Sequence, residues 1–128
     1  RYSEKEGIDA RDAQAKSRAS LERYLHYFNR YANHEQSARL DRQLYQRIEK
    51  KMEDIQLTSE LSWIEVQFLK KAADTLTECR MTLKWTYCMA YYLERNNMTE
   101  LFEDNQRYVL YFCLLMQRFG TSCGRAIR

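Results

Sequence analysis

The chain has 128 residues and no proline, and its three glycines, Gly7, Gly120 and Gly124, all lie near its ends. Nothing between residues 8 and 119 locks φ or favours a positive φ, which excludes β-sandwiches and other folds that need a turn about every 8–12 residues. The net charge of +3 comes from four arginines in residues 107–128; residues 1–106 hold 17 basic and 18 acidic residues, a balance that argues against nucleic-acid binding.

The first predicted element is a long helix over about residues 12–57, preceded by a polar linker at residues 1–11. Four apolar residues step by 4, 3 and 4 and therefore share one helix face: Leu21, Leu25, Phe28 and Ala32. This register fails across residues 33–37, and a second stripe begins at Asp41. We therefore expect either a bend near residues 33–37 or two half-helices that bury different faces.

Two further helices are predicted over residues 62–95 and 98–119. Ser62 and Glu65 have the spacing of a capping box, and Asn97 offers the next cap. Between residues 66 and 90 apolar side chains follow heptad-like steps, with Arg80 as the only polar interruption. The third helix is expected to stop at Gly120 or earlier. Because short connections make helices antiparallel neighbours, the sequence predicts an all-α, elongated bundle of about three long antiparallel helices.

No pattern of catalytic or metal-binding residues is present. The four cysteines include no C-x-x-C pair, and neither His26 nor His34 lies at the spacing of a metal site. The sequence also has no glycine-rich phosphate loop. We therefore expect no catalytic residue, metal or cofactor in this chain. The longest apolar run, residues 108–116, is about half of a membrane span, so no membrane partner is expected.

Several long segments resemble the Ariadne domain of Ariadne-type RING-between-RING (RBR) ubiquitin ligases, in a fungal-like version. They lie at residues 10–18, 21–31, 33–37, 62–69, 82–87, 90–93 and 102–106. The resemblance divides the chain into a linker from a preceding catalytic module at residues 1–11 and the amino-terminal part of an Ariadne-like helical domain at residues 12–106. Residues 107–128 form an atypical apolar and basic tail that resembles nothing in the family.

The resemblance implies a regulatory function. In that family the ligase passes ubiquitin through a cysteine of its second RING-like domain, and the helical Ariadne domain packs on that domain and masks the cysteine. Docking on a neddylated cullin–RING ligase relieves the block. The implied parent is thus a ubiquitin transferase that has zinc in its upstream RING-like modules, works with an E2 conjugating enzyme and ubiquitin, and resides in the cytoplasm or also in the nucleus.

Three residues match the family's inhibitory contact surface by position. Leu40 and Asp41 match an aromatic–acidic pair, with leucine in the aromatic place, and Glu103 matches an acidic contact. Asp41 also lies in the stripe of the second half-helix, where core packing alone favours an apolar residue. The resemblance therefore predicts an inhibitory interface with the catalytic domain at Leu40, Asp41 and Glu103.

Two other functions fit the residues. A structural helical module would self-associate through the face formed by residues 66–90. A helical ligand-binding or redox domain would use the many aromatic residues, ten tyrosines among them, to line a pocket. The first would show concentration-dependent oligomers, and the second would carry a bound chromophore or metal.

Overall fold

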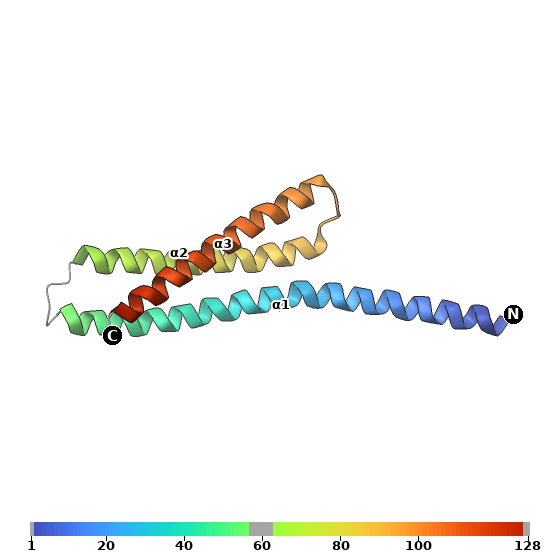
Figure 1. Cartoon of the computed structure of the whole chain (residues 1–128), viewed down its shortest axis with the longest axis horizontal. Coiled ribbons are helices and arrows are strands. Elements are labelled where there is room, and N and C mark those ends of the chain that lie inside the picture. The colour runs from blue at the N-terminus through green and yellow to red at the C-terminus, as the bar shows by residue number, and fades with distance from the viewer. Residues whose placement is uncertain (1, 57–62, 127–128) are drawn as a thin grey trace.

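The computed structural model describes residues 2–56 and 63–126. It consists of three long helices: α1 (Tyr2–Gln56), α2 (Trp63–Tyr92) and α3 (Asn97–Ala126). α2 runs back antiparallel to α1, and α3 returns across α2 at an oblique angle (Figure 1). α2 packs against both other helices, whereas α1 and α3 share few contacts. The predicted all-α bundle of three long antiparallel helices is confirmed.

α1 begins at Tyr2, so the predicted start near Asp12 was wrong. Residues 3–22 consist largely of alanine, arginine, lysine, glutamate and glutamine, which are strong helix formers even without an apolar face. Every side chain from Ser3 to Glu22 is exposed, and only Gly7 is partly covered. This part of α1 projects past the ends of α2 and α3 (Figure 1). The polar composition of residues 3–22 therefore correctly indicated exposure to solvent. These residues nevertheless form a helix and not the predicted linker.

The predicted register slip at residues 33–37 was also wrong. α1 continues as a helix through this stretch, with only gentle curvature along its length (Figure 1). The side chains that turn toward α2 follow one unbroken series of 4-3 steps: Tyr27, Tyr31, His34, Ala38, Asp41, Tyr45, Ile48 and Met52. The apolar stripe used for the prediction lies beside this seam and is exposed, as Leu21 and Phe28 are at 57% and 47%. Because the seam contains His34 and Asp41, hydrophobicity alone did not reveal it.

α2 supplies the centre of the core, as its sequence predicted. The heptad-like face includes the buried residues Leu76, Leu83, Tyr87 and Ala90. Cys113 of α3 joins this cluster, and Tyr27 of α1 packs against it. Burying a side chain such as Leu83 contributes about 1.5–3 kcal/mol, so this face holds the bundle together. The cap predicted at Ser62 lies outside the described residues.

The turn between α2 and α3 is closed by a reciprocal cap one residue earlier than predicted. Asn96 Oδ1 accepts a hydrogen bond from the Thr99 amide at 3.0 Å, and Thr99 Oγ1 accepts one from the Asn96 amide at 3.2 Å. Asn96 rather than Asn97 is therefore the capping residue. At the other end α3 passes through Gly120 to Ala126, so the predicted stop at Gly120 was wrong. A glycine inside a helix costs only about 1 kcal/mol and does not by itself end it.

Candidate functional site: a polar junction and two surface patches

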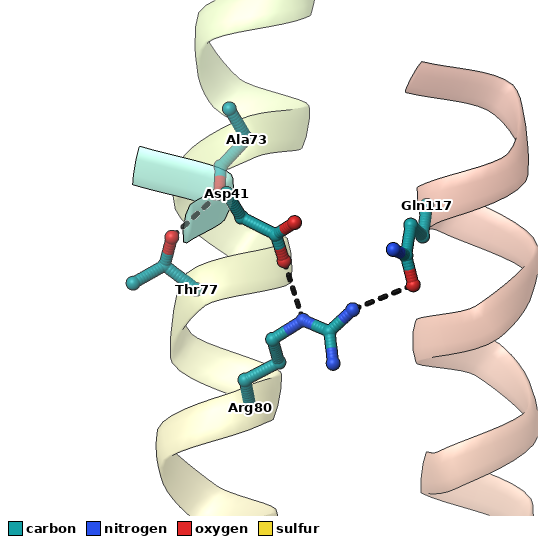
Figure 2. A network of polar contacts seen from close by, with 5 residues as sticks. All are labelled: Asp41, Ala73, Thr77, Arg80 and Gln117. Atoms are coloured by element: carbon teal, nitrogen blue, oxygen red, sulfur yellow. Dashed lines mark hydrogen bonds and ion pairs between the residues drawn. The ribbon is translucent and has the colours of Figure 1, made fainter. Parts of the chain in front are cut away.

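Arg80 lies where all three helices meet. It was the polar interruption in the apolar face of α2, and it is only 4% exposed. Its Nε donates to Asp41 Oδ2 of α1 at 2.5 Å, and its Nη2 donates to Gln117 Oε1 of α3 at 2.7 Å. Figure 2 shows the guanidinium between these two partners. One buried side chain thus connects the three helices.

The Arg80 junction constrains how the helices pack, because a buried guanidinium needs hydrogen-bond and charge partners. Removing one member of a buried ion pair typically costs about 3–5 kcal/mol, since the other charge is left desolvated and unpaired. Asp41 is the acidic residue of the α1 seam, and Arg80 is the charged residue in the heptad-like face of α2. The two apolar faces can therefore be aligned in only one register without burying a lone charge.

His34 is a second polar residue of the α1 seam. Its ring stacks on Tyr87 at 5.5 Å between centroids and 12° between planes. Burial lowers the pKa of His34 below its usual value, and the nearby positive charge of Arg80 lowers that pKa further. The buried Nδ1 atom of His34 has no hydrogen-bond partner among the described residues. The imidazole is therefore held neutral inside the bundle.

Leu40 and Asp41, two of the predicted contact residues, have different surroundings. Leu40 is 55% exposed on α1. The Asp41 side chain keeps 15% exposure, and one of its oxygens is bound by Arg80. The position of Asp41 in a stripe that should be apolar is thus explained by a partner inside this chain. Its role as a contact to another domain stays a prediction.

Glu103, the third predicted residue, lies elsewhere. It is half-buried at the wall of a cavity of about 390 Å³, lined by Arg23, His26, Tyr27, Ala90, Leu93, Arg95, Thr99 and Glu103. Burial and then Arg30 lower the pKa of His26, and the charge of Glu103 partly offsets them. Leu40 follows His26 by 14 residues, which is about 21 Å along a helix. The structure therefore forms two patches, one at Leu40 and Asp41 and one at Glu103.

Lys84 is a buried charge that the sequence did not single out. It is 5% exposed, and its Nζ lies 3.4 Å from Glu35 Oε1. The ammonium also sits over the rings of Tyr31 and Trp85, at 5.0 and 4.8 Å from their centroids. A cation between two aromatic faces and a carboxylate is well stabilised despite burial. Its sequence neighbours are apolar, so only pairing with α1 could have revealed it.

The cysteines of the described part of the chain, Cys79, Cys88 and Cys113, are free thiols. Cys113 is fully buried, and burial together with the adjacent Cys79 raises its pKa to about 12, so its reactive thiolate is scarce near neutral pH. Within residues 2–56 and 63–126, no three His, Cys, Asp or Glu side chains gather as a metal site would need.

None of the three helices, as far as the structure describes them, has the length and hydrophobicity needed to span a membrane.

Comparison with known proteins gives a consistent result. Residues 22–108 match the model of the Ariadne domain. The chain is 67% identical over 107 residues to the E3 ubiquitin-protein ligase dbl4 of Schizosaccharomyces pombe, covering 84% of this chain and 21% of that protein. It is 57% identical over 107 residues to ariadne-1 of Drosophila melanogaster, covering 84% and 21%. Over 106 residues it is 55% identical to human ARIH1, covering 83% and 19%.

The chain thus spans about a fifth of the length of these relatives. The matched segment begins at residue 22, where α1 leaves its projecting part and meets the bundle. It ends at residue 108, within α3 and next to the start of the atypical tail. The match covers most of the chain and includes the α1–α2 seam with Asp41 and Arg80, so the chain belongs to the Ariadne domain family of Ariadne-type RBR E3 ubiquitin ligases.

Proposed function

We propose that this chain is the regulatory helical part of an Ariadne-type RBR ubiquitin ligase. It packs on the second RING-like domain of the same protein, masks the active cysteine and restrains ubiquitin transfer. The ligase works with an E2 conjugating enzyme in the cytoplasm or nucleus, zinc is held by its upstream RING-like modules, and a neddylated cullin–RING ligase relieves the block. Family membership supports this proposal.

The observation that carries the proposal is the setting of Leu40. This large apolar side chain is 55% exposed beside an aspartate whose carboxylate is anchored by a buried arginine. Both residues lie in the middle of a continuous helix, so little conformational entropy is lost when a partner binds them. An apolar anchor next to a fixed acidic group is well suited to a complementary apolar and basic surface.

Glu103 extends the proposed interface. Its cavity neighbour His26 lies about 21 Å along α1 from Leu40, a span that a standard interface of about 800 Å² per partner can cover. Arg23 and Arg95 line the same cavity as Glu103. A partner that reaches Glu103 therefore also meets positive groups there, and this patch is electrostatically mixed.

Leu40→Ala in the full-length ligase is the cleanest test. The side chain is largely exposed, so the fold should be unaffected, whereas loss of an interface anchor costs about 2 kcal/mol or more. We expect ubiquitin discharge from the E2 thioester, without any cullin–RING partner, to rise about thirtyfold or more. Leu44→Ala is the matched control, because Leu44 lies one turn further along α1 and is 42% exposed.

The result that contradicts the proposal is unchanged discharge in a Leu40→Ala ligase whose melting temperature equals that of the wild type. Asp41 must be tested differently, because Asp41→Ala would leave Arg80 unpaired and destabilise the bundle. Asp41→Asn keeps an oxygen that can accept the Arg80 hydrogen bond and removes only the charge. If Asp41 contacts a basic partner, this variant should also raise discharge.

The alternative function, self-association through residues 66–90, is not favoured. Leu76, Leu83, Tyr87 and Ala90 of that face are buried within the chain itself. A second copy could reach them only after α1 or α3 had been displaced.

A further inference from the structure

α3 carries a second apolar seam on the side that faces away from α2. Gln106, Leu110 and Cys113 point inward, and Gln117 also reaches the core through Arg80. On the opposite side, six residues step by 4, 3, 4, 3 and 4: Leu101, Asn105, Tyr108, Phe112, Leu115 and Phe119. Tyr108 and Phe119 are more than 70% exposed, and Leu101 and Phe112 are 55% and 46% exposed. α3 thus carries a heptad-like row whose apolar residues, apart from the half-buried Leu115, are exposed in the described part of the chain.

This outward seam differs from ordinary surface hydrophobicity. A single exposed apolar residue needs no explanation, but a contiguous row does. Apolar side chains repeated every 3.5 residues are the pattern by which two helices pack side by side. Asn105 is the one polar residue of the row, and a single polar residue in such a seam sets the register at some cost in stability.

The charges of α3 indicate what packs on this seam. Before residue 107 its charged residues, Glu100, Glu103 and Asp104, are all acidic, and from Arg107 onward all are basic. Asp104, which also pairs with Arg107 of its own helix at 3.5 Å, lies on the same flank of the seam as Arg118, on the other side of Tyr111. In an antiparallel pair of identical helices equal flanks face each other, so Asp104 of one copy comes opposite Arg118 of the other. The opposed helix dipoles favour the same orientation.

We propose that the partner is a second copy of this chain and that two α3 helices pair antiparallel through this seam. The pair is symmetric about Leu110, which brings Leu101 opposite Phe119 and Tyr108 opposite Phe112 of the other copy. The acidic half of each helix then lies along the basic half of the other. The contact leaves α1, including Leu40, outside the interface, whereas Glu103 of the proposed regulatory interface lies on the same helix as the seam.

Sedimentation velocity of the 128-residue chain over a wide range of concentrations tests the proposal. The wild type should show a monomer–dimer equilibrium. Tyr108→Glu with Phe112→Glu places two charges in the centre of the seam and should raise the dimer dissociation constant at least a hundredfold, by about 3 kcal/mol or more. Leu21→Glu with Leu25→Glu is the matched control on α1, with the same spacing and comparable exposure, and should leave the dimer intact.

Charge reversal tests the orientation. Asp104→Arg alone should weaken the dimer several-fold, and adding Arg118→Asp in the same chain should restore it. A wild-type chain that stays monomeric at every concentration overturns the proposal and leaves the seam to another part of the ligase. A dimer that resists the Tyr108 and Phe112 changes, or that is not rescued by the double reversal, overturns it as well. Circular dichroism of each variant shows whether its helices are intact.

Discussion

The two parts of α1 show that one helix can be held by different forces. Residues 3–22 expose every side chain except the partly covered Gly7, whereas residues 27–52 carry the seam that packs on α2. The first part is about 30 Å of helix that depends on the intrinsic preferences of its residues and on continuation from the packed part. The second part is held by tertiary contacts, of which the Arg80 junction is the most demanding. Helix content alone therefore does not show which residues contribute to the stability of the bundle.

The largest effect is expected at the junction itself. Arg80→Leu removes a buried charge and leaves Asp41 and Gln117 without their donor, so the free energy of unfolding should fall by about 3 kcal/mol. Urea denaturation followed by circular dichroism measures this loss. Arg80→Leu combined with Asp41→Leu should recover most of it, because an apolar pair replaces an ion pair without leaving a lone charge. A single variant as stable as the wild type would show that the junction does not hold the packed part.

The next effect depends on pH and acts through His34. Its pKa is lowered in the folded state, so protons bind more readily to the unfolded chain. The stability contributed by the neutral imidazole is complete above about pH 6.5 and is lost as pH falls from there toward the lower folded-state pKa, by at most about 1.4 kcal/mol per pH unit. Thermal melts between pH 7 and pH 5 measure the slope.

His34→Asn is the control for that slope. The variant should be less stable at neutral pH but should lose less stability on acidification than the wild type. His26, whose pKa is also lowered, adds a smaller contribution in the same direction because it is exposed. An unchanged pH dependence in His34→Asn would mean that His34 is not the group that titrates.

The smallest expected change in stability comes from glycine substitutions in α1, which compare its projecting and packed parts directly. Gln14 and Gln46 are both exposed, one in the projecting part and one in the packed part. Gln46→Gly should lower the global unfolding free energy by somewhat less than 1 kcal/mol, whereas Gln14→Gly should leave it unchanged. Native-state hydrogen exchange should instead show faster opening of residues 3–22 in Gln14→Gly. Equal effects on global stability would mean that α1 unfolds as one unit.

Some features followed directly from residue patterns. The absence of proline and the lack of internal glycine predict long helices, because nothing between residues 8 and 119 interrupts the backbone. The apolar face of α2 and its single interruption at Arg80 were correct for the same local reason. The apolar character of the tail was also visible as a run of nine residues, 108–116, of which the structure buries only part.

Residue patterns along the chain could not predict which side chains of different helices contact each other. The α1 seam contains His34 and Asp41, so its 4-3 repeat cannot be recognised from hydrophobicity. It becomes apparent only when the structure places Tyr87 and Arg80 against these two residues. Lys84 and Gln117 are likewise ordinary polar residues until Glu35 and Arg80 are placed beside them. The predicted contacts Leu40, Asp41 and Glu103 came from resemblance rather than from spacing, and their inhibitory role stays a prediction. Their separation into two patches became visible only in three dimensions.

One physical cause explains why the helices were predictable from the sequence and the contacts between them were not. Helix formation depends on interactions within about four residues, so the order of side chains along the chain is sufficient to predict it. The energy of a buried charge depends on which group lies within a few ångströms, and that group can be 39 residues away, as Asp41 is from Arg80. The residues of α1, α2 and α3 therefore specified three helices locally, and packing across the bundle selected the register in which Asp41, Arg80 and Gln117 meet.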